Sequence, residues 1–377
     1  MDSFAPPPYP YDRLNELREV AAGLPGGVVD CSVGTPCDPP PEIVIQALHS
    51  SGTERSYPPS AGSPAFRRAC ADWLDRRFGV SLDPSNLAGC IGTKEIVASL
   101  AGFLHRRDRS RDTVLFPDVS YPTYAMSAEL AGLRAVAVPA LFADGTGVDL
   151  SQVSEGDAER ALVLWVNSPS NPTGGLSDLD AAASWGRIHD VPVFSDECYA
   201  EFTWAGPRRS ILESGPSGVV AVHSLSKRSN MAGLRVGFFA GDPELVHYLR
   251  DVRQHAGLMV PGPVQAAGAV AFSDDSHVEI QRGRYSERLA FFATVLTNAG
   301  FSAELPSGGF YLWVKAPERF DDAWEAAGYL ARTGGLLVAP GDLYGERGKG
   351  HLRIATVQPT SRLELVAERL EAASRSC

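Results

Sequence analysis

Residues 219–238 read VVAVHSLSKRSNMAGLRVGF and contain the segment that decides the fold. The run VVAVHSL is short, apolar and rich in valine, which is typical of a strand in a parallel sheet that is covered on both faces. The strand ends in two serines, and Lys227 follows at once. A lysine is rarely placed at the end of a buried strand unless another group pairs with it or uses it. The alternative is an exposed loop lysine beside a second cation, Arg228.

Strands of the same kind precede this segment. The apolar runs TVLFP, ALVLWVN and VPVFSD alternate with helix-like stretches such as YAMSAELAG and DLDAAASWGRIHD. Strand–helix alternation at this spacing predicts an α/β fold with a mostly parallel sheet. In such sheets, ligands bind beyond the carboxyl ends of the strands. Polar residues follow several of these strands, at Pro117-Asp118, Asn167-Ser168, Ser195-Asp196 and Ser224 to Lys227.

The chain has 377 residues, which is too long for one ordinary core and predicts two domains. We expect residues 1–44 to form an N-terminal arm and part of a small domain. Residues 45–279 would form a large α/β domain, and residues 280–377 would complete the small α+β domain. The helix-like run SDDSHVEIQRGRYSERLAFFATVLTNAG would link the two domains.

Composition and missing motifs disfavour several classes of function. The net charge of −11 disfavours a nucleic-acid-binding protein. The six cysteines form no C-x-x-C pair, and we see neither a signal peptide nor a membrane-spanning run, so we expect a cytoplasmic protein without membrane contact. The absence of P-loop, H-E-x-x-H and G-x-S-x-G motifs disfavours nucleotide, metal-dependent and serine hydrolysis, and we expect no metal.

Two stretches could each bind part of a ligand, the first a phosphate and the second a flat ring. In CIGTKEIVASL, Gly92 and Thr93 precede an apolar helical pattern, and a helix N-terminus with a glycine and a hydroxyl suits a phosphate. The alternative is an ordinary N-cap at Thr93 with Glu95 in the first turn. In PDVSYPTY, Tyr121 follows a strand end and could stack on a flat ring, or it could simply pack in a loop.

Three further stretches carry polar residues in unusual places. NSPSNPTGG has strong turn chemistry, and it could be only a structural turn. In FSDECYAEF, Asp196 closes a buried strand and requires a cationic or hydrogen-bonded partner, unless it caps a helix. In HLRIATV, Arg353 lies inside a short apolar strand, where a guanidinium requires a carboxylate from a ligand or from an internal salt bridge.

Taken together, these stretches resemble the pyridoxal 5'-phosphate (PLP) site of fold-type I aminotransferases, the class I/II group. The resemblance covers nearly the whole chain, and SLSKRSNMAGLRVGF, NPTG and SDECY are its most specific parts. It implies a large PLP-binding domain, with a mostly parallel sheet flanked by helices, and a smaller α+β domain. The residues that carry it are Asn171, Asp196, Tyr199, Ser224, Lys227, Arg235 and Arg353.

The resemblance also implies a role for each residue at the reacting end. Lys227 would form the Schiff base with the cofactor and then move a proton at the substrate Cα. Asp196 would pair with the pyridine nitrogen, and Tyr199 and Asn171 would hydrogen-bond the ring oxygen. Arg353 would bind the substrate α-carboxylate, assisted by the backbone around Gly34.

The same resemblance implies how the rest of the cofactor is held. Tyr121 would stack on the ring, and Tyr57 would reach the phosphate of the neighbouring subunit, which implies a homodimer with shared sites. The phosphate would be bound by Thr93, Lys94, Ser224 and Arg235, with Ser226 assisting.

Further stretches make the chain most similar to the actinobacterial succinyldiaminopimelate aminotransferase branch. They are DCSVGTPCDPP, YPPSAGSPAFRRA, IGTKE, SLSKRSNMAG, GLMVPGPVQAA and VAPGDLYG. This branch implies transfer between glutamate and N-succinyl-2-amino-6-oxopimelate, in diaminopimelate biosynthesis. Segment PSGGFYLWVK lies where such enzymes shape the side-chain pocket.

Other functions remain open on the same scaffold. A PLP enzyme of specialised metabolism could perform β- or γ-elimination or replacement, or could transaminate another substrate. The reactions share the first proton removal, so only the pocket lining and the products separate them. A sensor with an aminotransferase-like domain behind a DNA-binding domain is disfavoured, because the resemblance starts near residue 11 and leaves no room for a helix-turn-helix.

Overall fold

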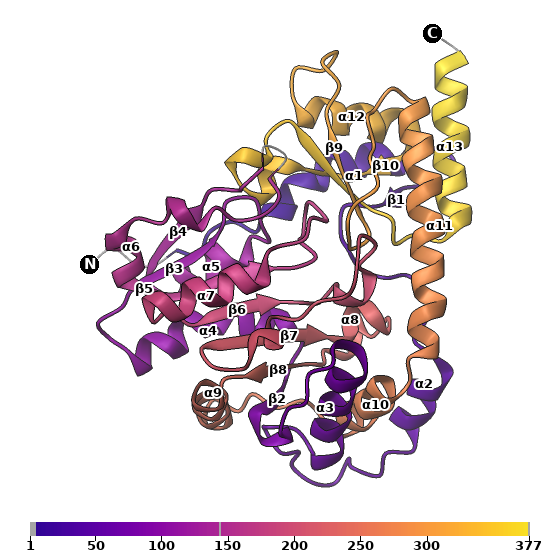
Figure 1. The fold of residues 1–377 in the computed structure, drawn as a ribbon. Helices are drawn as coiled ribbons and strands as arrows, with labels where there is room; N and C mark the ends of the chain where they lie inside the picture. The colour runs from indigo at the N-terminus through magenta and orange to yellow at the C-terminus, as the bar shows by residue number, and fades with distance from the viewer. Residues whose placement is uncertain (1–4, 143–144, 376–377) are drawn as a thin grey trace.

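The structure, a computed structural model, describes residues 5–142 and 145–375. Its centre is a seven-stranded sheet in the order β2-β8-β7-β6-β5-β3-β4 (Figure 1). In the described part of the chain, β8 is antiparallel to both of its neighbours and the other pairs are parallel, which confirms the predicted mostly parallel sheet. The strands are β2 (Leu87–Cys90), β3 (Thr113–Pro117), β4 (Arg134–Val138), β5 (Ala161–Asn167), β6 (Val193–Asp196), β7 (Val219–Ser224) and β8 (Gly237–Gly241).

Two apolar cores lie on the two faces of this sheet, because successive strand residues point to opposite faces. In β5, Leu164 packs into one core and Trp165 into the other. The first core includes α2 (Glu42–His49), α3 (Pro64–Phe78), α7 (Leu179–His189) and α10 (Gly262–Ser273). The second includes α4 (Thr93–Arg107), α5 (Thr123–Ala131) and α9 (Pro243–His255). The sheet is therefore covered on both sides, as its apolar strands predict.

Local sequence signals explain where helices begin and end, and α3 is an example. The Ser63 hydroxyl accepts a hydrogen bond from the Phe66 N–H at 3.2 Å, and Pro64 occupies the first helical position. At the other end, Gly79 has a φ of 66°, a conformation that glycine adopts without strain. Two shorter helices are α6 (Glu155–Arg160) and α8 (Leu225–Arg228).

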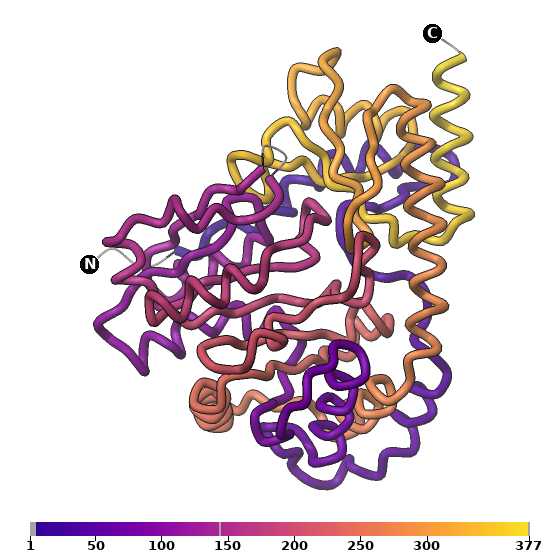
Figure 2. Tube along the Cα trace, viewed as in Figure 1, coloured from indigo at the N-terminus to yellow at the C-terminus, as the bar shows by residue number. Residues whose placement is uncertain are grey.

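A second body is built from both ends of the chain. Its sheets are β11-β12-β9 and the pair β1-β10, and the N-terminal segment lies among the C-terminal elements (Figure 2). The strands are β1 (Val29–Asp30), β9 (Tyr311–Lys315), β10 (Leu336–Leu337), β11 (Ala339–Pro340) and β12 (His351–Ala355). The helices are α1 (Asn15–Ala22), α11 (Ser276–Asn298), α12 (Ala323–Gly334) and α13 (Thr360–Arg375).

Helix α11 connects the two bodies. It begins close to α10 and α2 and runs up beside α13 (Figure 1), and its side chains Leu289, Phe292 and Leu296 belong to the second body's core. This is the link predicted for the long helical run. The domain boundaries at residues 44 and 279 stay a prediction. No helix in the described ranges has the length and apolar character needed to cross a membrane.

Candidate active site

A cavity of about 540 Å³ lies beyond the carboxyl ends of β5, β6 and β7, where the second body meets the central sheet. This is the edge at which ligands bind in open α/β sheets. Every predicted site residue except Tyr57 contributes to its wall. These residues are Gly34, Thr93, Lys94, Tyr121, Asn171, Asp196, Tyr199, Ser224, Ser226, Lys227, Arg235 and Arg353.

Lys227 projects into this cavity from α8, directly after β7. Its Nζ atom donates a hydrogen bond to the Gly34 carbonyl and lies 6.0 Å from the centre of the Phe310 ring. Burial lowers the pKa of this amine from 10.5 to about 8, because the charged form loses its hydration. No carboxylate of the described residues forms an ion pair with it. The side chain is half-buried and belongs to α8, so Lys227 is not the exposed loop lysine considered from the sequence.

Asp196 ends β6 and is buried in the cavity wall, with 7% of its surface exposed. Its carboxylate accepts hydrogen bonds from the Tyr124 hydroxyl at 3.1 Å and from the Cys198 N–H at 3.2 Å. Burial raises the pKa of Asp196, and these hydrogen bonds oppose the effect without cancelling it. The residue does not cap a helix. Among the described residues its polar contacts are hydrogen bonds, and none of them is an ion pair.

Arg353 reaches the cavity from β12 and is 2% exposed. One end of its guanidinium donates to Asn171 Oδ1 at 2.7 Å and the other to the Ser32 carbonyl, while Nε has no partner. The rings of Tyr311 and Tyr344 lie against it, with centres 4.4 and 4.7 Å from Cζ. No carboxylate of the described chain pairs with this cation, so the internal salt bridge considered from the sequence is absent there.

A third part of the wall can hold an anion. Helix α4 begins at Thr93, and its N-cap is Gly92 rather than Thr93, which corrects the capping alternative. Gly92 has a φ of 68°, and a Cβ atom there would lie 2.2 Å from Nη2 of Arg235. Only glycine therefore lets the exposed Arg235 guanidinium lie over the start of the helix. Ser224 and Ser226 add hydroxyl groups, 2.9 Å apart.

A series of close contacts joins Lys227 to Arg353. The hydroxyl groups of Tyr199 and Tyr311 lie 2.8 Å apart. A Cβ atom at Gly34 would lie 2.0 Å from the Tyr311 hydroxyl oxygen, so this approach requires glycine. Burial raises the pKa of Tyr199, which keeps its hydroxyl protonated and able to donate.

The loop after β5 is ordered by a residue that sequence reasoning did not assign. The Asn167 side chain donates to the Asp196 carbonyl at 2.7 Å and accepts from the Asn171 N–H at 2.7 Å. The NPTG segment is thus a structural turn that also brings Asn171 to Arg353. The segment is therefore both a turn and a part of the site.

Several other wall residues were missed from the sequence. Tyr9 and Tyr11 line the cavity from a segment that the prolines marked only as an extended arm. Tyr124 does not line the cavity, but its hydroxyl donates to the wall residue Asp196, and it could have been found because it follows Tyr121 by three residues at the start of a helix. Tyr57 lies outside the cavity, and 97% of its surface is exposed.

The arrangement fits PLP in chemical terms. An unpaired buried carboxylate suits a protonated ring nitrogen, and a primary amine of lowered pKa suits an aldehyde. A helix N-terminus with hydroxyl groups and an arginine suits a phosphate dianion. The unpaired Arg353 would then bind a substrate carboxylate.

Comparison with known proteins gives an independent result. The profile of the family described as Aminotransferase class I and II matches residues 27–370. OxyQ of Streptomyces rimosus, a 4-dedimethylamino-4-oxo-anhydrotetracycline transaminase, is 41% identical over 372 residues, which cover 97% of this chain and 99% of OxyQ. An LL-diaminopimelate aminotransferase of Aquifex aeolicus is 34% identical, with 97% and 96% covered. The structure of substrate-bound BacF from Bacillus subtilis has a TM-score of 0.90 at 26% identity, covering 99% of this chain and 98% of BacF.

Proposed function

The chain belongs to the class I and II aminotransferases, which are PLP enzymes, and on this premise we propose how its cavity transfers an amino group and between which compounds. The proposed donor is L-glutamate, and the acceptor is an acidic oxo compound. The observation that carries this proposal is Arg353, a buried cation without a carboxylate partner in the described residues, in the same cavity as Lys227. When bound, PLP supplies an aldehyde for the amino group and a ring that withdraws electrons from the substrate Cα.

Lys227 would be the covalent anchor of the cofactor and the general base. Only an uncharged amine can attack an aldehyde or accept a proton. With a pKa of about 8, roughly a tenth of the Lys227 side chains are uncharged at pH 7, far more than for an ordinary lysine. Nζ would then accept the proton that leaves the substrate Cα, a step worth about 10²–10⁴-fold in rate.

Asp196 and Tyr199 would act on opposite sides of the ring. The Asp196 carboxylate would hold the ring nitrogen in its protonated form, and Tyr124 would fix the carboxylate through its 3.1 Å hydrogen bond. Tyr199 and Asn171 would donate to the ring oxygen. Because Asn171 Oδ1 already accepts from Arg353, its amide N–H group is the part that would face the cofactor.

The anion-binding corner would hold the phosphate. Ser224, Ser226 and the start of α4 would donate hydrogen bonds, with Thr93 and Lys94 beside them and Arg235 supplying charge. Tyr121 would lie on the ring face. We also propose a homodimer, in which the exposed Tyr57 side chain reaches the phosphate of the second subunit.

Arg353 would bind the substrate α-carboxylate, with Gly34 close to the same group. A planar guanidinium binds a carboxylate through two parallel hydrogen bonds. The flanking rings of Tyr311 and Tyr344 restrict it before the substrate arrives, which lowers the entropy lost on binding. This would place the substrate Cα between Arg353 and Lys227.

The first candidate acceptor is N-succinyl-2-amino-6-oxopimelate, as the sequence resemblance implies. The similarity to LL-diaminopimelate aminotransferases supports a substrate of this chemical type. A flat aromatic ketone is the second candidate. It is favoured by the tyrosines of the wall, Tyr9, Tyr11, Tyr121 and Tyr311, and by the 41% identity to the 4-dedimethylamino-4-oxo-anhydrotetracycline transaminase OxyQ.

The first experiment mixes cofactor-loaded protein with L-glutamate alone. We expect the visible absorbance of the bound cofactor to fall while pyridoxamine phosphate and 2-oxoglutarate appear. Lys227→Ala is the control, and after dialysis it should lack the starting absorbance. An unchanged spectrum in the parent protein would reject glutamate or transamination. Release of ammonia from other amino acids would then favour elimination or replacement chemistry.

A second step identifies the acceptor. Protein that holds pyridoxamine phosphate after the first experiment is mixed either with succinylated amino-oxopimelate or with a polycyclic aromatic ketone. The compound that restores the original absorbance at the higher kcat/KM is the better acceptor. A strong preference for the aromatic ketone would reject the diaminopimelate assignment and leave the aminotransferase mechanism intact.

A further inference from the structure

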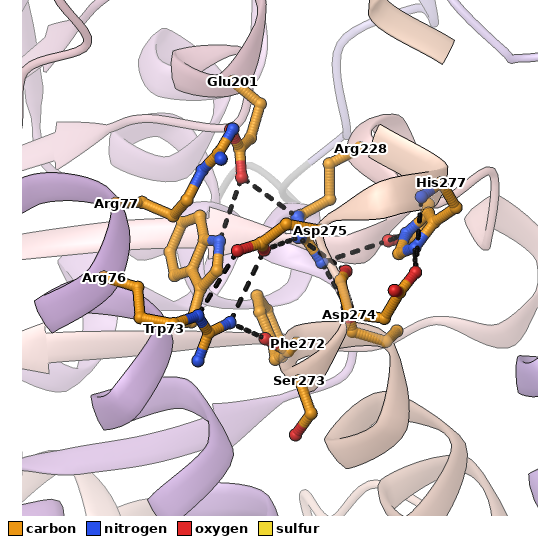
Figure 3. Close-up of polar contacts among 12 residues, drawn as sticks. Trp73, Arg76, Arg77, Glu201, Arg228, Phe272, Ser273, Asp274, Asp275 and His277 are labelled. Carbon is orange, nitrogen blue, oxygen red and sulfur yellow. Dashed lines mark hydrogen bonds and ion pairs between the residues drawn. The ribbon is translucent and has the colours of Figure 1, made fainter. Parts of the chain in front are cut away.

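A buried network of charges begins at Arg228, the residue after Lys227 (Figure 3). Arg228 ends α8 and is 2% exposed, and its side chain does not line the cavity. Its Nε lies 3.4 Å from Glu201, one Nη lies 3.2 Å from Asp275, and the other donates to the Ala271 carbonyl at 2.6 Å. The indole of Trp73 lies 5.4 Å from its Cζ. Every nitrogen of this buried cation therefore has an acceptor, which a charge in that position requires.

The acceptor Glu201 lies two residues after Tyr199 and is equally buried. It also accepts from the Trp73 indole at 2.9 Å and pairs with Arg77 at 2.7 Å. Burial alone would raise the pKa of Glu201, but Arg228 and Arg77 lower it below its ordinary value. An ionised pair thus joins the segment that carries Lys227 to the segment that carries Tyr199.

The same segment is also attached to the start of α11. Arg228 contacts Asp275, the residue before this helix, and the Ser229 hydroxyl lies 2.8 Å from His277 Nε2. The Asn230 side chain donates to Gln281 at 3.1 Å. Three consecutive residues after Lys227 are therefore tied to the first turns of the helix that connects the two bodies.

We infer that Arg228 is a positioning residue that keeps Lys227 in the water-poor wall of the cavity. Helix α8 has only four residues, so its own hydrogen bonds cannot fix its orientation. Its position depends on tertiary contacts, and those of Arg228 act on two elements at once. The meaning of this position for catalysis rests on the proposed role of Lys227.

The test measures the amine itself in cofactor-free protein. The rate at which a water-soluble amine reagent labels Lys227 is followed by peptide mass spectrometry over a range of pH. In the parent protein, the pH at which the labelling rate is half its maximum (the labelling midpoint) should lie near the lowered pKa of Lys227, about 8. In Arg228→Met, α8 loosens and water reaches the amine, so the midpoint should rise by about half a unit or more. Arg228→Lys keeps the charge and should restore most of the difference.

Arg208→Met is the matched control. Arg208 lies 3.1 Å from the same Glu201 carboxylate, but among the described residues it forms ion pairs with Glu201 and Glu279 and with no residue of α8. Both variants should lower the thermal midpoint of unfolding, and only Arg228→Met should move the labelling midpoint. Equal labelling midpoints in the two variants would overturn the inference, because the role of Arg228 would then be structural only.

A second variant, Glu201→Gln, allows the same test if Arg228→Met does not fold. Glu201→Gln keeps an oxygen acceptor for the Trp73 indole and removes the charge that faces Arg228. An upward shift of its labelling midpoint supports the inference, and an unchanged midpoint overturns it. The result does not depend on the proposed anchor role, because no cofactor is present. Failure of that role would show instead as retained absorbance in dialysed Lys227→Ala.

Discussion

At the scale of single residues, Lys227 is held where its charge is disfavoured. Loss of hydration is the largest cause of its lowered pKa, and the cations Arg353 and Arg235 act in the same direction. Cys198 and Asp196 oppose them. Folding increases the uncharged fraction of this amine, which makes it more reactive. Because the folded protein disfavours the charge, the stability of the cofactor-free protein is reduced at neutral pH.

The stability effect has a definite sign. The unfolded chain titrates Lys227 at the ordinary value of 10.5, and the folded chain titrates it at about 8. Between these values the unfolded chain binds more protons, so stability rises with pH there, and the full cost is present below pH 8. We expect cofactor-free Lys227→Met to be more stable than the parent by about 1–3 kcal/mol at pH 7, less toward pH 10.5. Urea unfolding at several pH values measures the difference, and a less stable variant at pH 7 would contradict the argument.

Residues in local motifs were predictable, and residues brought in by the fold were not. Lys227 and Asp196 stand at strand ends next to recognisable sequence. Tyr311 stands in a stretch flagged for the side-chain pocket, yet its contact with Gly34 depends on a strand and a loop nearly three hundred residues apart. Nothing local in the sequence indicates that approach.

At the scale of elements, the start of α4 depends on one glycine. Gly92 combines a left-handed φ of 68° with the approach of Arg235. An added methyl group would push the guanidinium away from the helix N-terminus, where the backbone N–H groups favour an anion. The fold should tolerate this, because the displaced group is the exposed end of a flexible side chain.

We therefore expect Gly92→Ala to weaken PLP binding about tenfold or more, and to weaken binding of pyridoxal, which lacks the phosphate, much less. Gly215→Ala is the control, because the φ and ψ of Gly215, 86° and 153°, are close to the 68° and 156° of Gly92, and no described atom lies within 4 Å of an added Cβ there. It carries the backbone strain without the clash. Equilibrium dialysis with both ligands measures the effect, and equal losses for PLP and pyridoxal would reject a phosphate site at this position.

The type of most elements could be read from periodicity, whereas their partners could not. The apolar runs gave β3, β5, β6 and β7 and the helices between them. The reversed direction of β8 and the pairing of β1 with β10 were not predictable, because β1 is two residues long and its partner lies some three hundred residues away. Such pairings are decided by the packing of the whole chain.

At the scale of the whole molecule, the α/β architecture expected from the family resemblance is confirmed. The site residues that the resemblance implies line one cavity, apart from Tyr57, and their roles stay a prediction. That residue is exposed on a single chain, and the cavity is lined without it. With 97% of its surface exposed, the Tyr57 side chain is free to contact another subunit, which a buried side chain would not be. The exposure is compatible with the proposal, which comes from the family resemblance, that Tyr57 reaches the phosphate of a second subunit.

The assignment can be tested by mixing subunits. Tyr57→Phe removes one hydroxyl and should weaken PLP binding about tenfold, the loss of one hydrogen bond to a charged group. In a hybrid of Tyr57→Phe and Lys227→Ala subunits, one site would combine an intact Lys227 with an intact Tyr57 from the other chain. That site should recover parental PLP affinity and glutamate turnover. If Tyr57 instead served its own chain, each site of the hybrid would keep one defect and no recovery would occur. Remixing after mild dissociation, with differently tagged subunits, separates these outcomes.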